Sequence, residues 1–165
     1  MIIILFRCAG IQDNFLDGAG TGLAIYLQGC DFHCPGCHNP SLQDKTAGFL
    51  YDTNQVLNHL TNYKGFYQSL IFLGGEPMLQ PKCIYTLALN SNLINILYTG
   101  YPFEDLPNYI KQVMHVVVDG QYKKELKTGS FPASKNQRIF INQHEHKQDF
   151  RKYYNADTMH IFGHI

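Results

Sequence analysis

The chain lacks tryptophan, an excess of charge of either sign, and any apolar run long enough to span a membrane. Lysine plus arginine and aspartate plus glutamate both number 13, so the formal net charge is zero. A chain with no positive excess is poorly suited to neutralising nucleic-acid phosphates. The apolar start at residues 1–6 is too short for a transmembrane helix and precedes no signal cleavage site, so we expect a strand there.

Repeats, linkers and low-complexity segments are also missing from the 165 residues. This length predicts a single domain over residues 1–165, with a core at about 15–142 and a C-terminal tail at 143–165 of unknown role. The five cysteines are an odd number, and three of them are clustered. This pattern argues against a secreted disulfide framework and predicts a reducing, cytoplasmic location.

The clustered cysteines are Cys30, Cys34 and Cys37, spaced C-x3-C-x2-C within the stretch Gly29–Pro40. Cysteine thiolates are the usual ligands of iron–sulfur clusters. A cubane [4Fe–4S] cluster has four irons, so three cysteines leave one iron without a protein ligand. An iron left open in this way can bind an external chelator, which predicts a catalytic site.

A zinc site is the alternative interpretation of the same loop, with either His33 or His38 as the fourth tetrahedral ligand. Structural zinc motifs more often combine C-x2-C with a second, distant pair of ligands. The spacing therefore favours the cluster, and zinc stays open as a second possibility.

Strand-like and helix-like patterns alternate along the chain. Apolar and β-branched runs predict strands at 2–7, 23–27, 69–73, 92–98, 114–118 and 139–141. Helical patterns fall at 53–63, 78–90, 104–111 and partly at 121–127, with Thr53 or Asn54 as the first N-cap. Such alternation indicates parallel βαβ units. About five or six parallel strands are too few to close an eight-stranded barrel, so we expect an α/β fold, a partial (open) β/α barrel.

Two glycine-rich turns flank predicted strands. The run Gly18-x-Gly20-x-Gly22 precedes a strand, whereas a dinucleotide-binding fingerprint follows one, so we reject that reading. The segment Gly74–Pro77 follows the strand at 69–73. Its two glycines permit close approach by a ligand, and Glu76 supplies an acceptor at the strand end.

The cysteine loop and the Gly74–Pro77 turn together resemble the radical S-adenosylmethionine (SAM) enzymes. Within that superfamily the chain is similar to the activating enzymes of anaerobic ribonucleotide reductase. This resemblance rests on Asp17–Gly20, Gln28–Pro40, Gly74–Pro77, Leu97–Tyr101, Val118–Gly120 and Asn136–Arg138. Ala19 departs from the proline of the Asp-Gly-Pro-Gly motif, and Tyr98 stands where longer activases have an aspartate.

The resemblance implies a site, residue by residue. Cys30, Cys34 and Cys37 would bind the cluster, whose fourth iron is chelated by SAM. The residues implied in SAM binding are Gly36, Cys37, His38, Gly74, Gly75, Glu76, Pro77, Thr99 and Asp119. Asp17 and Gly18 would lie at the rim, near an incoming peptide.

The resemblance also implies a reaction and its partners. An electron from the reduced [4Fe–4S] cluster would cleave SAM, and the resulting radical would take a hydrogen from a glycine of the large reductase subunit. The expected partners are that subunit and a one-electron reductant such as flavodoxin, with no nucleic acid and no membrane. The alternatives are a pyruvate formate-lyase-type activase, a deazapurine synthase-like enzyme, or a zinc-binding interaction module.

The remaining candidate residues have simpler interpretations. Cys8 and Cys83 are expected to be buried thiols. The histidines of the tail, His144, His146, His160 and His164, are expected on a solvated face. Lys123, Lys124 and Lys127 form a predicted surface run.

Overall fold

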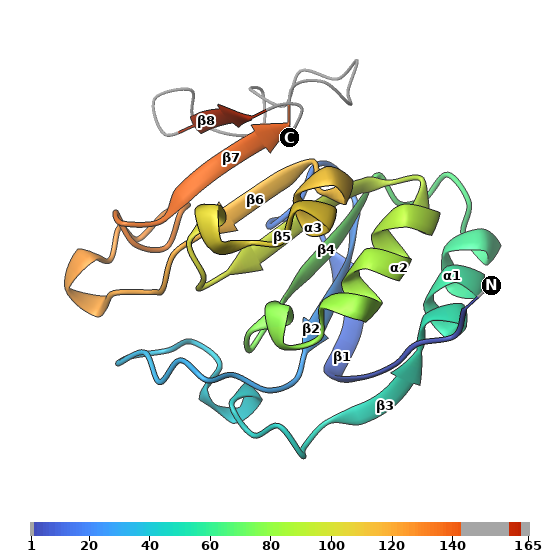
Figure 1. Cartoon of the computed structure of the whole chain (residues 1–165), viewed down its shortest axis with the longest axis horizontal. Helices are drawn as coiled ribbons and strands as arrows, with labels where there is room; N and C mark the ends of the chain where they lie inside the picture. The colour runs from blue at the N-terminus through green and yellow to red at the C-terminus, as the bar shows by residue number, and fades with distance from the viewer. Residues whose placement is uncertain (1, 143–158, 163–165) are drawn as a thin grey trace.

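A computed structural model describes residues 2–142 and 159–162 of the chain. These residues form one mixed sheet with three α-helices (Figure 1). The strands are β1 Leu5–Asn14, β2 Gly22–Leu27, β3 Phe49–Asp52, β4 Ser69–Gly74, β5 Ile94–Thr99, β6 Val116–Asp119, β7 Arg138–Asn142 and β8 Met159–Phe162. The helices are α1 Thr53–Asn62, α2 Pro81–Ser91 and α3 Asn108–Val113, with 3-10 turns η1 Pro40–Leu42, η2 Pro77–Leu79, η3 Phe103–Asp105 and η4 Lys124–Leu126.

The sheet is eight-stranded, in the order β3-β1-β2-β4-β5-β6-β7-β8. Strands β2, β4, β5 and β6 run parallel to one another, and β1, β3 and β7 each pair antiparallel with a neighbour. The α/β class is therefore confirmed. The prediction of five or six parallel strands is wrong, because only β2, β4, β5 and β6 are parallel to one another. The predicted first and last strands, β1 and β7, lie antiparallel to these four.

Strand β1 is longer than the sequence indicates. The predicted strand ends at residue 7, but residues 8–14 continue β1 and pair with β2 in a hairpin. A register irregularity between Cys8 and Gly10 interrupts the pairing. A bulge and a glycine break the alternation of apolar and polar residues that identifies a strand. The short strand β3 was missed as well.

Apolar side chains cover both faces of the sheet. On one face the core includes Val56 and Leu57 of α1, and Ile84 and Leu87 of α2, and Figure 1 shows the three helices along this face. The other face has its own cluster, with Ile71, Ile96, Val116 and Ile139 fully buried. The central strands are apolar on both sides, as expected for a parallel run.

Helix α1 begins at Thr53, as the sequence predicts, but its N-cap lies before the predicted positions. The N-cap is Asp52, not Thr53 or Asn54. The Asp52 carboxylate accepts from the Gln55 backbone N–H at 2.9 Å, and the Gln55 side chain accepts from the Asp52 N–H at 2.8 Å. This reciprocal pair of hydrogen bonds is a capping box, an arrangement that stabilises helix N-termini. None of the described helices is long and apolar enough to cross a membrane.

A buried amide ties the amino end of β5 to two helices. The Asn95 side chain donates to the carbonyl of Ala88, in α2, at 2.9 Å and to that of Val113, in α3, at 3.0 Å. Its own oxygen accepts from the Ser91 hydroxyl at 3.0 Å. Because Asn95 is 3% exposed, water cannot replace these bonds.

Replacing Asn95 with alanine is therefore expected to lower the free energy of unfolding by about 2–4 kcal/mol, since buried carbonyls lose their donors. The matched control is Asn90→Ala on α2, an exposed side chain with one local bond to Thr86. That change should cost less than about 0.5 kcal/mol. Anaerobic urea unfolding measures both, and equal losses would contradict the role given to Asn95.

Candidate functional site

The cysteine loop begins where β2 ends, and two glutamines hold its base. The Gln28 side chain donates to the carbonyls of Ser41 at 3.1 Å and Asp44 at 2.7 Å, which lie on the far side of the loop. Gln80 donates to the Gln28 carbonyl at 3.0 Å. Backbone bonds complete the closure, including Gly29 N–H to the Leu42 carbonyl at 2.8 Å. The two ends of the loop therefore have fixed positions.

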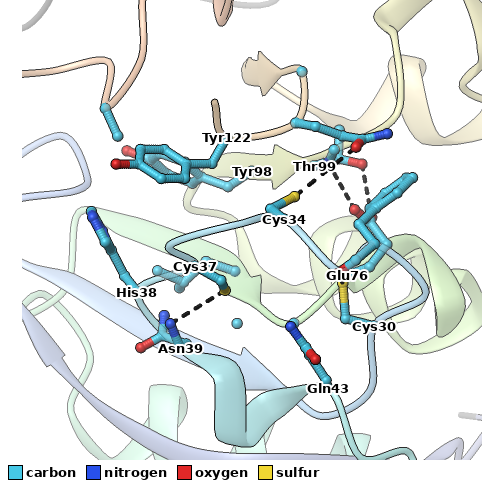
Figure 2. A pocket seen from close by; sticks show the side chains of 18 of the residues that line it. Cys30, Cys34, Cys37, His38, Asn39, Gln43, Glu76, Tyr98, Thr99 and Tyr122 are labelled. Atoms are coloured by element: carbon cyan, nitrogen blue, oxygen red, sulfur yellow. Dashed lines mark hydrogen bonds between the residues drawn. The ribbon is translucent and has the colours of Figure 1, made fainter. Parts of the chain in front are cut away.

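The three thiols of this loop line one pocket of about 230 Å³. Figure 2 shows the side chains of Cys30, Cys34 and Cys37 around it. All three are free thiols and half-buried. Burial raises the pKa of Cys30 and Cys34 above the ordinary thiol value. Burial therefore favours the protonated form of these two thiols, which would release protons on binding a metal.

A glycine pair brings the end of β4 against the start of the cysteine loop. Gly75 N–H donates to the Leu27 carbonyl at 2.9 Å, and Glu76 N–H donates to the Gly29 carbonyl at 2.7 Å. A side chain at Gly75 would collide with the backbone carbonyls of Gly29 and Leu42. Gly74 has φ +122°, a conformation that side chains rarely adopt. The turn after β4 and the cysteine loop thus meet through backbone atoms.

Glu76 places a carboxylate at the floor of the pocket, with 1% of the residue exposed. Its oxygens accept from the Thr99 hydroxyl at 2.7 Å, Gly100 N–H at 2.7 Å and Met78 N–H at 2.8 Å. Burial raises the pKa of Glu76, and these three donors partly offset the effect. The carboxylate therefore links the ends of β4 and β5.

Aromatic and amide side chains line the opposite side of the pocket, and sequence analysis missed them. Tyr122 lies with its ring centroid 5.0 Å from that of His38, and the Gln121 side chain lies 4.0 Å from the Cys34 sulfur. Tyr98 also lines the pocket. Residues 121 and 122 directly follow Gly120 at the end of β6, which lies next to β5 in the sheet. Their position after the carboxyl end of a parallel strand could have identified them as pocket residues from the sequence.

The pocket brings together eight of the residues that the resemblance implied: Cys30, Cys34, Cys37, His38, Gly74, Gly75, Glu76 and Thr99. Gly36, Pro77, Asp17, Gly18 and Asp119 are not among its lining residues.

Asp119 instead has local structural partners. Its carboxylate accepts from the Phe103 N–H at 2.6 Å and from the Arg138 guanidinium, which also binds Glu104. This network joins β6, β7 and the turn η3. The Glu104 pKa is lowered to about 2, mainly because its carboxylate accepts from Arg138.

The other two cysteines lie away from the pocket. Cys8 is 0% exposed and Cys83 is 1% exposed, which confirms the expectation of buried thiols. Burial raises the pKa of Cys8 to about 11 and of Cys83 to about 12. Of the tail histidines, His160 is exposed and stacks on Phe140. The predictions for His144, His146 and His164, and for the role of the tail, lie outside the described residues.

The donor set suits an iron–sulfur cluster, since sulfur ligands from three free cysteines line one pocket. Within residues 2–142 and 159–162, no three histidine, cysteine, aspartate or glutamate side chains are close enough to hold a single metal ion. Thiolates that bind a cubane attach to different irons, so they stand further apart than the ligands of one zinc ion.

Comparison with known proteins identifies the class first. The profile of the "4Fe-4S single cluster domain" family matches residues 16–140, so the chain belongs to that family of iron–sulfur proteins. Individual relatives of the chain identify a more specific family. The anaerobic ribonucleoside-triphosphate reductase-activating protein of Enterobacteria phage T4 is 32% identical, with 78% of this chain and 89% of the phage protein covered. The chain belongs to this family of activating proteins, which are enzymes of the radical-SAM type.

Further relatives agree with this assignment. The activating protein of the same name from Escherichia coli (strain K12) is 27% identical over 76% of this chain and 92% of its own length. A pyruvate formate-lyase-activating enzyme from Clostridium pasteurianum is also 27% identical, but only 53% of it is covered. The match to proteins of both names supports an activase of glycyl-radical enzymes.

Replacing Thr99 with valine is expected to lower the free energy of unfolding by about 1.5–3 kcal/mol, because the buried Glu76 carboxylate loses a hydroxyl donor while side-chain volume is kept. The control is Thr99→Ser, which keeps the hydroxyl and should lose less than half as much. Urea unfolding of the metal-free protein measures both variants. A serine variant as unstable as the valine variant would contradict the stabilising role of this hydrogen bond.

Proposed function

We propose that this protein activates anaerobic ribonucleotide reductase by generating a glycyl radical on its large subunit, using SAM and a [4Fe–4S] cluster. The observation that carries the proposal is the single pocket formed by three free thiols and the Gly74–Glu76 turn, in a chain of the activating-protein family. One domain would carry this activity, with the parallel run and its helices arranged as a partial β/α barrel of the radical-SAM type.

Each side of the pocket has a separate role in the proposal. Cys30, Cys34 and Cys37 hold three irons of the cluster. Gly75 and Glu76, with Gly74 and Pro77, receive the methionine end of SAM, whose ammonium group would meet the Glu76 carboxylate. The adenosyl part would lie against Cys37 and His38, which line the pocket, and beside Gly36, which lies outside its lining. Thr99 keeps the Glu76 carboxylate oriented by the hydrogen bond between them.

The bound cluster and SAM supply the radical chemistry, namely one-electron cleavage of a carbon–sulfur bond to a 5′-deoxyadenosyl radical. The protein's contribution is orientation and shielding. Glu76 is nearly fully buried and its carboxylate accepts three hydrogen bonds, so a bound ammonium group would be held in a fixed place. Tyr98, Tyr122 and Phe32 add apolar surface that limits access of water.

The loop between β1 and β2 is suited to contact the reductase. Phe15 is 67% exposed and Leu16 is 91% exposed, so both present apolar surface to solvent. The Asn14 side chain accepts from the Leu16 and Asp17 N–H groups, at 2.9 and 2.8 Å, and the Tyr98 hydroxyl donates to the Asp17 carbonyl at 2.7 Å. Because Tyr98 also lines the pocket, a peptide bound at Asp17 and Gly18 would lie beside the site.

The decisive test is glycyl-radical formation by the reconstituted protein. The anaerobic protein, reduced with dithionite in the presence of SAM, is mixed with an anaerobic ribonucleotide reductase large subunit and followed by electron paramagnetic resonance (EPR). A glycyl-radical doublet and release of 5′-deoxyadenosine are expected. A parallel reaction with pyruvate formate-lyase tests the other target. Radical formation on that enzyme alone would reassign the target, and no SAM cleavage at all would refute the proposal.

Single replacement of Cys30, Cys34 or Cys37 by alanine is expected to lower iron and sulfide from about four per chain to well below one, because the remaining thiols cannot hold a cubane. Iron and sulfide analysis and the EPR spectrum of the reduced protein measure the loss. The control is Cys83→Ala, which removes a thiol distant from the pocket and should retain the full cluster. One zinc per chain in the wild type, without iron, would favour the zinc-binding alternative.

Replacing Phe15 and Leu16 together with serine is expected to weaken binding of the large reductase subunit at least about tenfold, since each buried apolar side chain contributes about 1.5–3 kcal/mol. SAM cleavage without the reductase should stay within about twofold of wild type. The control is Leu89→Ser on α2, which is 57% exposed. An unchanged dissociation constant for the double variant would exclude this loop as a contact surface.

A further inference from the structure

A strongly basic segment lies at the rim of the pocket. Between residues 121 and 136 the chain carries four lysines, Lys123, Lys124, Lys127 and Lys135, and only one acidic residue, Glu125. All four lysines are exposed, and none forms an ion pair within the part of the chain that the structure describes. We call these four residues the lysine patch. Its positive charge stands out because the whole chain is neutral.

The lysine patch belongs to an ordered hairpin. Lys135 N–H donates to the Leu126 carbonyl at 2.9 Å, and Lys127 and Ser134 form an antiparallel bridge. The Asn136 side chain donates to the Gln121 carbonyl at 2.8 Å and closes the base of the hairpin. The backbone that carries the lysines is therefore fixed, and their charges stay on one side of the molecule.

This hairpin packs directly against the cysteine loop. The aliphatic stem of Lys124 lies so close to Gly36 that a Cβ there would be 3.1 Å from the lysine Cδ. Two further contacts join the same segments, Gln121 with Cys34 and Tyr122 with His38. Figure 1 shows the hairpin, in orange, on the same side of the molecule as the cysteine loop, in blue to cyan.

The tip of the cysteine loop beside the patch is open to solvent. Pro35 and Gly36 are exposed, and they lie between Cys34 and Cys37. A protein docked on the lysines would therefore touch the loop that holds the proposed cluster. A small-molecule substrate approaching the pocket would have no need of four lysine charges that lack an acidic partner among the described residues.

We propose that the lysine patch is the docking site for an acidic one-electron donor protein that reduces the cluster. The inference rests on the proposed function, which requires one electron per reductive cleavage of SAM. In the step, the donor is oxidised by one electron and the cluster is reduced by one, and no bond forms or breaks. Positive charge beside the acceptor attracts an acidic donor and raises the association rate, more strongly at low ionic strength.

The test reverses the charge of the patch without touching the pocket. The double variant Lys123→Glu, Lys127→Glu changes the local charge by four units. It keeps Lys124, whose stem packs against Gly36. Lys64→Glu with Lys82→Glu is the matched control, since both lysines are exposed on elements away from the cysteine loop. The probe is reduced flavodoxin, an acidic donor, and the measurement is the second-order rate constant of cluster reduction in stopped flow.

At low salt, flavodoxin is expected to reduce the cluster of the patch variant at least tenfold more slowly than that of the wild type. The rate constant of the control variant should stay within twofold of the wild-type value. The difference should shrink below about threefold at 0.5 M salt, where the Debye length is only a few ångströms. Photoreduction with 5-deazaflavin, a small reductant, should reach the same extent in every protein. Unchanged rates with flavodoxin, or an equal loss in the control variant, would overturn the proposal.

Two other outcomes have separate meanings. If the patch variant binds the large reductase subunit more weakly but accepts electrons from flavodoxin normally, the patch is a reductase contact and the proposal is wrong. If the wild-type protein holds no cluster that 5-deazaflavin can reduce, the proposed function itself fails, and this inference fails with it.

Discussion

The site depends on the backbone contact between the carboxyl ends of β2 and β4. The two strands are parallel and in register up to Leu27 and Gly74, and the hydrogen bonds then continue beyond the strands. Gly75 N–H donates to the Leu27 carbonyl, and Glu76 N–H donates to the carbonyl of Gly29, the residue before Cys30. Because Gly75 leaves no room for a side chain, this approach is possible only with glycine. The position of the first cysteine relative to the Glu76 carboxylate is a consequence of strand register.

A second strand end joins the first through a buried charge. The Glu76 carboxylate, just after β4, accepts hydrogen bonds from Thr99, the last residue of β5, and from Gly100, so the ends of two parallel strands meet at one carboxylate. Burying that charge is costly, and the three donors offset the cost only in part. An ammonium group bound there would complete the compensation. The proposed function thus places a positively charged group of the ligand next to the three thiols.

The antiparallel strands at the sides of the sheet are joined by the segments that are proposed to contact partners. The β1–β2 hairpin presents Phe15 and Leu16, held by Asn14 and Tyr98. The segment between β6 and β7 presents the lysine patch and packs Lys124 on Gly36. Both segments border the pocket, which is formed at the ends of the parallel strands. The parallel strands thus carry the proposed cofactor site, and the flanking hairpins are the proposed surfaces for the reductase and the electron donor.

Local sequence alone determined the α/β class, most of the strands and helices, and the two segments that meet in the pocket. It could do so because thiol spacing, glycine pairs and apolar runs express their chemistry over a few residues. Only the tertiary structure decided that β1 continues to Asn14 and that Asp119 pairs with Arg138 and Phe103 instead of lining the pocket. Strand pairing and salt bridges depend on residues far apart in the chain. The same holds for the place of the lysines: the sequence shows a basic run, and folding sets it against the cysteine loop.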